Sequence, residues 1–397
     1  MRYAFKGYKP TSCSTKNSIS ELWACIQASV AKWRTTNISI RSKRVGILLF
    51  IALSAYSTNA NSKLKFLSFS PSQISLNRTA VPLTASQLGR FAGSHGGFQW
   101  NKGDNKTAKW RPQGIAGFVS GGRNFMAVSW YGRKSENYEN RGVRVSFVDL
   151  SNRAAIKYRH VLLVDELFRP FVDMHAGGLV IRNNRLHVPD SRSNANRIHV
   201  FDLNKILEVP KLVEKKFFGY RYVLRKTASY SVPVKPSFMS YDWEANQMLV
   251  GTFHRCGKTH SDTETCRSQK NNKLVWFPLS QTNRAFSSVC GPFFSEMQGA
   301  ATGRIAGIGQ PILWAASSYG RSGISHLHIS TVNRGSCSRE GARLGKVRTI
   351  TYPPGLEDLH ISKPSGNIWM LTEFGPHEGS GNDRVVFVTH KNKLKPF

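Results

Sequence analysis

A repeat of about sixty residues is the feature that most restricts how this 397-residue chain can fold. Five segments follow one plan: a polar residue beside Gly, Ala or Asp, an apolar run, a turn, and a second apolar run. The second run ends in a polar or aromatic residue. The segments begin at Gln113, His175, about position 240, Gln298 and Glu357. Self-similarity at such a period is typical of propellers, solenoids and arrays.

The apolar runs are short, rich in Val, Ile, Phe, Tyr and Trp, and bounded by Gly, Asn, Asp and Ser, which predicts strands. Two further strands follow in several repeats, for example 143–149 and 157–164 in the first. Four strands per repeat form the blade of a β-propeller. We therefore predict an all-β fold, a β-propeller with five blades preferred and six possible. A β-sandwich, which also has evenly spaced strands, is the alternative.

The last repeat shows three strands and ends with 384–389. We expect an N-terminal strand from residues 80–92 to supply the missing fourth strand and to close the ring, which would remove the exposed sheet edges.

The first sixty residues predict an export signal. Four residues, Arg41 to Arg44, precede an apolar run at 45–55, and small residues follow at Ser57, Thr58 and Ala60. The run is shorter than the roughly 20 residues that span a bilayer. About forty residues precede it, so either translation starts downstream or the segment is an uncleaved anchor with a basic cytoplasmic tail. The alternative is a buried helix.

These observations divide the chain into four parts. We assign a basic N-terminal extension to 1–44, a signal peptide or membrane anchor to 45–60, a polar linker to 61–79 and the propeller domain to 80–397. The expected localisation is secreted or periplasmic, or membrane-anchored through 45–60.

Cysteine usage agrees with export, because the exported part holds an even number of cysteines that an oxidising compartment allows to pair. The four are Cys256, Cys266, Cys290 and Cys337. We predict disulfides between the first two and between the last two. A zinc site with His254 or His260 is the alternative, although no CxxC pair is present.

The chain has 56 Lys and Arg against 23 Asp and Glu, a net charge of +33, which points to an anionic partner. Residues 1–60 hold nine of the basic residues and one acidic residue, so +25 remains on the exported part. The basic residues of the domain are scattered, as at Arg141, Arg144 and Arg159, and on strands such residues usually form a solvated face. Specific nucleic-acid recognition is not predicted, since no reading helix or zinc finger is visible. Weak attachment to a membrane or envelope surface is expected.

The innermost strand of each blade lines the central channel of a propeller, so the polar residues at the start of each repeat should meet in one funnel. The expected ligand-binding residues are Gln113, Ser240, Asp242, Gln298, Asp190 and Glu373, the last two closing second strands. The alternative is that such residues cap strand ends and bond loop amides.

Three further polar residues at the start of repeats suit acid–base chemistry: His175, Glu357 and Asp358. Adjacent side chains on a strand face opposite ways, so we expect one of the two carboxylates to enter the funnel. The carboxylates could instead bind calcium together with Asp173, Asp190 or Asp242, although no repeated calcium loop is present. No other cofactor is predicted.

Several strings resemble a group of secreted bacterial proteins with propeller-like repeats and no assigned activity. They are Pro112-Gln-Gly114, His175-Ala-Gly-Gly178, Met297-Gln-Gly-Ala300 and Glu357-Asp-Leu359. The resemblance covers roughly residues 98–390 and implies export and a propeller, with no catalytic residues to transfer. The long basic leader and the high charge depart from that group.

Together these features predict an exported, monomeric β-propeller that binds a glycan or another anionic envelope or extracellular ligand at its central funnel. Two alternatives stay open. The first is a hydrolase or lyase acting on a sugar or lactone, with His175 as base and Glu357 or Asp358 as acid or metal ligand. The second is a scaffold for protein partners. Whether the protein is an enzyme is left undecided.

Overall fold

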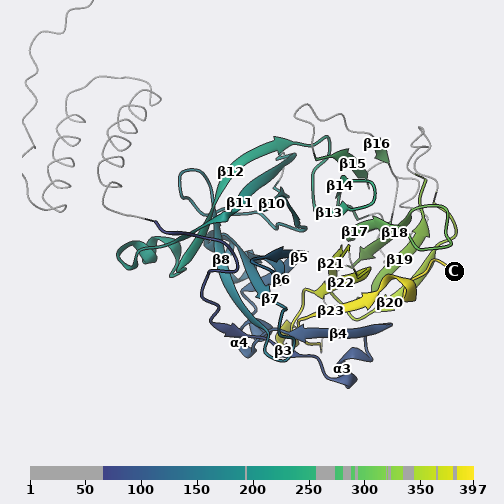
Figure 1. Cartoon of the computed structure of the whole chain (residues 1–397), viewed down its shortest axis with the longest axis horizontal. Helices are drawn as coiled ribbons and strands as arrows, with labels where there is room; N and C mark the ends of the chain where they lie inside the picture. The colour runs from purple at the N-terminus through teal and green to yellow at the C-terminus, as the bar shows by residue number, and fades with distance from the viewer. Residues whose placement is uncertain are drawn as a thin grey trace, which may run out of the picture. The chain divides into compact units, whose positions relative to one another are not determined.

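The computed structural model describes residues 66–192, 195–255, 273–279, 288–290, 294–318, 320, 323–333, 344–363, 365–378 and 382–397. In these residues the chain consists mainly of antiparallel strands that succeed one another along the sequence (Figure 1). The described helices are short: α3 (Ala85–Leu88), α4 (Lys102–Lys106), η1 (Lys134–Glu136), η2 (Glu139–Arg141), η3 (Lys211–Phe217), η5 (Pro376–Glu378) and η6 (Lys391–Lys393).

The strands after residue 110 form five consecutive units in the described part of the chain, and each unit is a meander. The first unit is β5 (Trp110–Ser120), β6 (Arg123–Gly132), β7 (Val143–Asp149) and β8 (Lys157–Val164). The second is β9 (Val180–Arg182), β10 (Arg185–Asp190), β11 (Arg197–Glu208) and β12 (Tyr222–Ser231). The third is β13 (Phe238–Asp242), β14 (Gln247–Gly251), β15 (Leu274–Pro278) and β16 (Ser288–Cys290).

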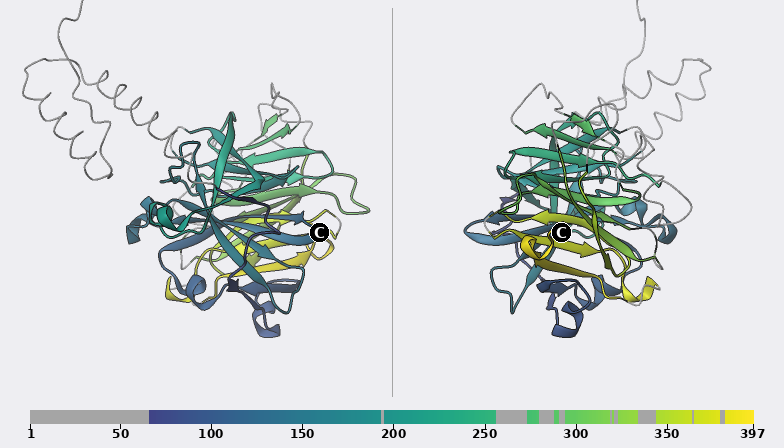
Figure 2. Two further views of the ribbon diagram at one scale, coloured as in Figure 1. Left: turned by 60° about the vertical axis from the view of Figure 1, so that its left-hand side comes forward. Right: turned by 90° about the vertical axis from the view of Figure 1, so that its right-hand side faces the viewer.

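The fourth unit is β17 (Met297–Gly303), β18 (Ile312–Ser317), β19 (Ser325–Thr331) and β20 (Arg348–Tyr352). The fifth is β21 (Leu356–Ile361), β22 (Asn367–Thr372) and β23 (Val385–His390), extended by β4 (Ser94–Gln99) and β3 (Val81–Pro82). The first strands of the units contact one another in succession, and β21 contacts β5 (Figures 1 and 2). The predicted all-β propeller is confirmed.

Tight turns join the strands where the sequence supplies residues that tolerate positive φ. Gly121 and Gly122, between β5 and β6, have φ of 54° and 73°. Asn183 and Asn184, between β9 and β10, have φ of 51° and 56°. Two successive residues with positive φ fit the type I′ turn, whose twist matches that of the two flanking strands.

Each unit packs face to face against the next one, so both faces of most strands are buried. Phe147 of the first unit shares an apolar cluster with Leu186 of the second. Phe98 of the fifth unit shares another cluster with Trp130 of the first. Burial of one such side chain contributes about 1.5–3 kcal/mol. Packing between sheets, and not hydrogen bonding between them, therefore holds most of the units together.

The first strands approach one another so closely that a side chain cannot fit between them. A Cβ atom on Gly114 would lie 2.7 Å from the Cα of Gly178, and one on Gly299 would lie 2.6 Å from the Cα of Asp358. Non-bonded carbon atoms prefer about 3.5–4.0 Å. The glycines of three of the recurring strings are therefore explained by contact between backbones at the centre of the fold.

The N-terminal part differs from the expectation in two ways. The strand that pairs with β23 is Ser94–Gln99, not 80–92, because 85–88 form a helical turn that begins at a capping box on Thr84. Residues 66–79, which the sequence assigns to a linker, belong to the folded unit. Within them β1 (Ser68–Phe69) pairs with β11, and β2 (Arg78–Thr79) pairs with β8.

Several predictions fall outside the described residues. The leader at 1–60 does, and so do Cys256, Cys266 and Cys337 and the side chain of Cys290. The two disulfides and the export signal therefore stay predictions. Among the described residues, no helix is long and apolar enough to cross a membrane.

Candidate functional site

A pocket of about 460 Å³ lies at the ends of the first strands where four of the five repeats begin. All five units contribute to its lining, which we call the funnel pocket. The lining residues are Gln113, Tyr131, Asp173, His175, Ser191, Arg192, Lys235, Ser237, Phe253, Gln298, Glu357 and Glu373. Five of them belong to the site predicted from the sequence: Gln113, His175, Gln298, Glu357 and Glu373.

Two carboxyl groups lie side by side at this pocket. Glu357, in β21, and Glu373, just after β22, are both buried, and their side chains hydrogen-bond to each other. Burial, and next the charge and hydrogen bond of Glu373, raise the pKa of Glu357 well above its usual range, while Arg111 opposes the shift. Two carboxylates in contact cannot both ionise readily. This environment therefore favours the protonated form of Glu357.

Three donors converge on one oxygen of Glu373. Glu373 Oε1 accepts hydrogen bonds from Arg111 Nη1 at 3.2 Å, Gln113 Nε2 at 3.3 Å and the Tyr131 hydroxyl at 3.2 Å. Arg111 also donates to Glu378 Oε1 at 2.8 Å. Burial and the charge of Glu373 raise the pKa of Tyr131. Each of these side chains is therefore fixed by a partner, and the carboxyl pair is held rigidly.

His175 forms one wall of the pocket. Its ring stacks on the Tyr131 ring, with centroids 4.3 Å apart and planes 17° apart. Its backbone N–H donates to Ser191 Oγ at 2.9 Å. Although the residue keeps an exposed surface, protein atoms crowd its ring, and this desolvation, with the charges of Lys235 and Arg111, lowers the pKa of His175. A neutral imidazole can accept a proton.

Two cations stand at the rim. Lys235 is exposed and makes no ion pair with a side chain in the described part of the chain. Arg192 is held by two hydrogen bonds to Asp190, Nε to Oδ1 at 2.8 Å and Nη2 to Oδ2 at 2.6 Å. Asp190, predicted as a ligand-binding residue, is almost fully buried and lies outside the lining. Its place in the structure is to position Arg192.

Three other predicted site residues also lie outside the pocket and bond the protein itself. Asp358 Oδ2 accepts from the Ile115 N–H at 3.0 Å. Ser240 Oγ donates to the Ala300 carbonyl at 2.6 Å, and Asp242 Oδ2 accepts from Thr302 Oγ1 at 2.5 Å. All three predicted residues are buried. They tie neighbouring first strands together through partners that lie within strands.

The carboxylates considered above as calcium ligands serve the separate structural roles just described. No group of three or more His, Cys, Asp or Glu residues that could hold a metal ion occurs in the described ranges. As predicted, one residue of the adjacent Glu357 and Asp358 enters the pocket while the other faces away.

Sequence reasoning missed part of the lining. Tyr131 lies near the end of the second strand of its repeat, close to the position that Glu373 occupies in the fifth repeat, so the repeat phase contained a signal for it. Ser237 begins the third repeat, three residues before the predicted Ser240. Lys235, Arg192 and Phe253 lie in connections between strands and follow no repeat phase.

No family model and no curated protein sequence matches the chain. Among solved structures it is similar to the Bombyx mori GH32 β-fructofuranosidase BmSUC1, with 11% identity and a TM-score of 0.39, covering 70% of this chain and 58% of that one. It is also similar to the GH43_1 enzyme from Xanthomonas citri complexed with xylotriose (9%, TM-score 0.36, 76% and 91%). Kuenenia stuttgartiensis hydrazine synthase is a third similar structure (10%, 0.30, 68% and 79%).

Proposed function

We propose that the funnel pocket binds an acidic sugar, as the end or a unit of an anionic glycan outside the cytoplasm. The observation that carries this proposal is the convergence of five predicted polar residues and two rim cations on one pocket. A volume of about 460 Å³ suits a small ligand, since such sites span roughly 300–1,000 Å³.

The lining offers a partner for each part of such a ligand. Gln298 and the carboxyl pair present acceptors and donors for sugar hydroxyls. Tyr131 and Phe253 offer apolar surface for a ring. Lys235 offers a charge that no described side chain neutralises, so a ligand carboxylate is the group that it would bind most strongly.

The test is calorimetric titration of the full chain with uronic-acid oligosaccharides and with neutral oligosaccharides of the same length. We expect the acidic ligands to bind more tightly. We expect Lys235→Gln to weaken acidic-ligand binding by about tenfold, the usual effect of losing a charged hydrogen bond. The matched control is Lys211→Gln, an exposed lysine outside the pocket. Equal binding by both variants, or no preference for acidic ligands, would refute the proposal.

A second candidate is acid–base catalysis at the same pocket, favoured by the opposite pKa shifts of two lining residues. The pKa of His175 is lowered and that of Glu357 is raised, which supplies a base and an acid together. The Glu357 and Glu373 side chains are in contact, whereas glycosidase carboxyls stand roughly 5–9.5 Å apart. A lyase reaction therefore fits better than hydrolysis by that pair.

In such an elimination His175 would take the proton beside the sugar carboxylate, and the C–O bond to the leaving sugar would break as a C=C bond forms. Glu357 would give its proton to the leaving oxygen. The product is a conjugated unsaturated acid, which ultraviolet absorbance detects. We expect His175→Ala to abolish turnover while ligand binding persists. Binding without turnover in the unsubstituted protein would leave the binding function and exclude this one.

Export is a further part of the proposal and is supported by the sequence of residues 41–60. Cell fractionation with N-terminal sequencing of the mature protein tests it. An intact cytoplasmic protein would contradict it.

A further inference from the structure

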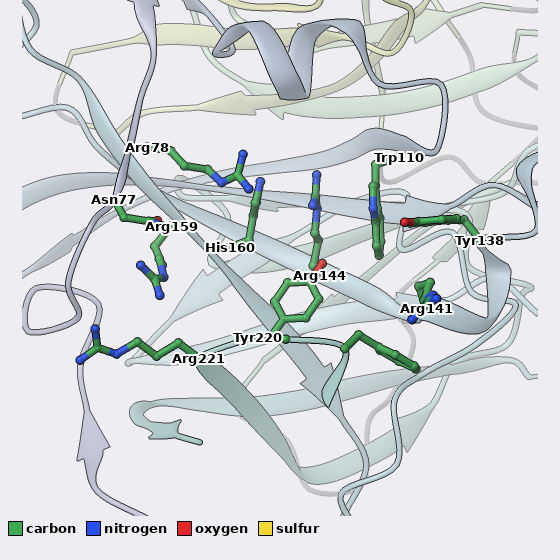
Figure 3. A pocket seen from close by; sticks show the side chains of 12 residues that line it. Asn77, Arg78, Trp110, Tyr138, Arg141, Arg144, Arg159, His160, Tyr220 and Arg221 are labelled. Carbon is green, nitrogen blue, oxygen red and sulfur yellow. The ribbon is translucent and has the colours of Figure 1, made fainter. Parts of the chain in front are cut away.

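A second pocket, of about 330 Å³, lies where the first and second units join, and five arginines line it. We call it the arginine pocket. Its lining is Asn77, Arg78, Trp110, Tyr138, Arg141, Arg144, Arg159, His160, Phe218, Gly219, Tyr220 and Arg221 (Figure 3). It shares no residue with the funnel pocket, so a ligand bound here would not depend on the function proposed there.

An unusual strand pairing builds this pocket. β12 runs parallel to β8, with Val223 beside Leu162, so the outer strands of two units form one continuous sheet. The chain enters β12 through Phe218 and Gly219, which have φ of 56° and 80°. This turn brings Tyr220 and Arg221 up to Arg159 of β8.

One buried carboxylate organises part of the cluster. Asp104 Oδ1 accepts from Arg144 Nη2 at 3.0 Å, and its Oδ2 accepts from Arg78 Nη1 at 3.0 Å and the Tyr158 hydroxyl at 2.6 Å. His160 Nε2 lies 3.0 Å from the same Oδ2. Burial opposes ionisation of Asp104, but His160, Arg144 and Arg78 hold its pKa well below the usual range. Asp104 therefore pairs with two of the five arginines, Arg144 and Arg78.

The remaining arginines are less completely neutralised. Arg221 pairs with Glu208 at 2.7 Å. Arg159 and Arg141 make no ion pair with a side chain of the described residues, and both lie over aromatic rings, Arg159 over Tyr222 at 5.2 Å. Burial lowers the pKa of Arg159, and Arg221 and Arg78 lower it further, while Glu214 opposes them. An added anion would relieve this repulsion.

Figure 3 shows how the charges are placed. Arg78, Arg159 and Arg221 lie on one side of the pocket, Arg141 lies on the other, and Arg144 and Tyr220 lie between them. A single small anion at one end would leave the other end unpaired. Guanidinium groups bind phosphate and sulfate oxygens in pairs, with fork geometry.

We propose that the arginine pocket binds a ligand that carries two or more phosphate or sulfate groups. The Arg159 side receives one oxyanion, and Arg141 receives another. The aromatic rings of Trp110, Tyr138 and Tyr220 line the space between them.

The proposal is tested by calorimetric titration of the full chain with pyrophosphate, orthophosphate, inorganic sulfate and a disulfated disaccharide. We expect pyrophosphate or the disulfated sugar to bind at least about tenfold more tightly than the single anions. Which of the two binds better distinguishes a phosphorylated from a sulfated ligand. Equal weak binding of all four probes would overturn the proposal.

Two variants locate the site. Arg159→Gln and Arg141→Gln lie outside the Asp104 network, so neither should unfold the protein, and each should weaken binding of the better probe by about tenfold. The matched control is Arg185→Gln, which removes the same charge from an exposed position on β10. If all three variants lose the same affinity, the interaction is a general effect of positive charge and the site assignment is wrong.

Discussion

Replacing Glu357 with glutamine tests whether the pKa of this buried carboxyl group is raised in the folded protein. Burial and the neighbouring Glu373 raise the pKa of Glu357, so the folded protein binds this proton more tightly than the unfolded chain, whose Glu pKa is about 4.3. Between that value and the raised pKa, folding takes up a proton. The unsubstituted protein must therefore lose stability as pH rises through this window.

The size of the effect follows from one proton. Linkage gives a change of at most about 1.4 kcal/mol in the free energy of unfolding for each pH unit. Glutamine has the shape of protonated glutamate and its N–H can donate to Glu373, so Glu357→Gln removes the titration and keeps the bond. The variant and the unsubstituted protein should be equally stable near pH 4, and the variant should become increasingly more stable above it.

Urea unfolding of both proteins at half-unit pH steps from 4 to 8 measures this difference. Asp358, whose pKa burial also raises, is present in both proteins and cancels in the comparison. Glu136→Gln, a partly exposed glutamate on η1 that lies 3.7 Å from Arg133, is the control and should give a difference that varies far less with pH. A flat difference for Glu357→Gln, or one that grows in the opposite direction, would refute the raised pKa of Glu357.

Other predictions concern the fold around the two pockets. Gly178→Ala should destabilise the protein by about 3 kcal/mol, because its Cβ would lie 2.1 Å from the Met239 nitrogen. Gly309→Ala, which places a Cβ in open space, should change the stability little. Thermal unfolding of the two variants measures the difference. Arg384→Met should lower the free energy of unfolding by about 3–5 kcal/mol, because the fully buried guanidinium donates to Glu378 and to several backbone carbonyls. Denaturant unfolding measures this change, and a decrease below about 1 kcal/mol would contradict the prediction. Asp104→Asn should destabilise by about 3–5 kcal/mol at pH 7. Because the folded pKa of Asp104 is lowered, that difference should shrink as pH falls below about 3.9, which urea unfolding at pH 7 and pH 3 measures.

The repeat phase predicted the fold and the funnel because both depend on the same geometry. A residue at the start of a first strand comes to the mouth of the central funnel whichever unit it belongs to, so Gln113, Gln298 and Glu357 were found from spacing alone. Where the phase was read three residues late, in the third repeat, the prediction selected Ser240, which bonds a neighbouring strand. The error in the third repeat therefore traces to the alignment between repeats.

The lining residues that lie in connections between strands do not follow the repeat phase. Lys235 and Arg192 reach the pocket because loops at one end of the fold converge, and loop positions carry no periodic signal. The role of Asp190 was misread for the same reason, since its partner Arg192 lies two residues beyond the strand end. A polar residue at a strand end can face a ligand or hold a second side chain that does so.

The scattered arginines show where reading charge from sequence fails. Arg144 and Arg159 lie on two neighbouring strands, where alternation predicts a solvated face, yet Arg144 is only 5% exposed and both line a pocket. The outer edge of this unit, strand β8, is covered by β2 beside Tyr158 and by β12 beside Leu162. Both coverings depend on pairings between distant segments, β2 with β8 and β12 with β8, that no local pattern encodes. Arginines that are scattered along the sequence are therefore brought together by the strand pairing. A cluster of arginines favours a multiply charged anion, whereas scattered arginines would only attract the protein to an anionic surface.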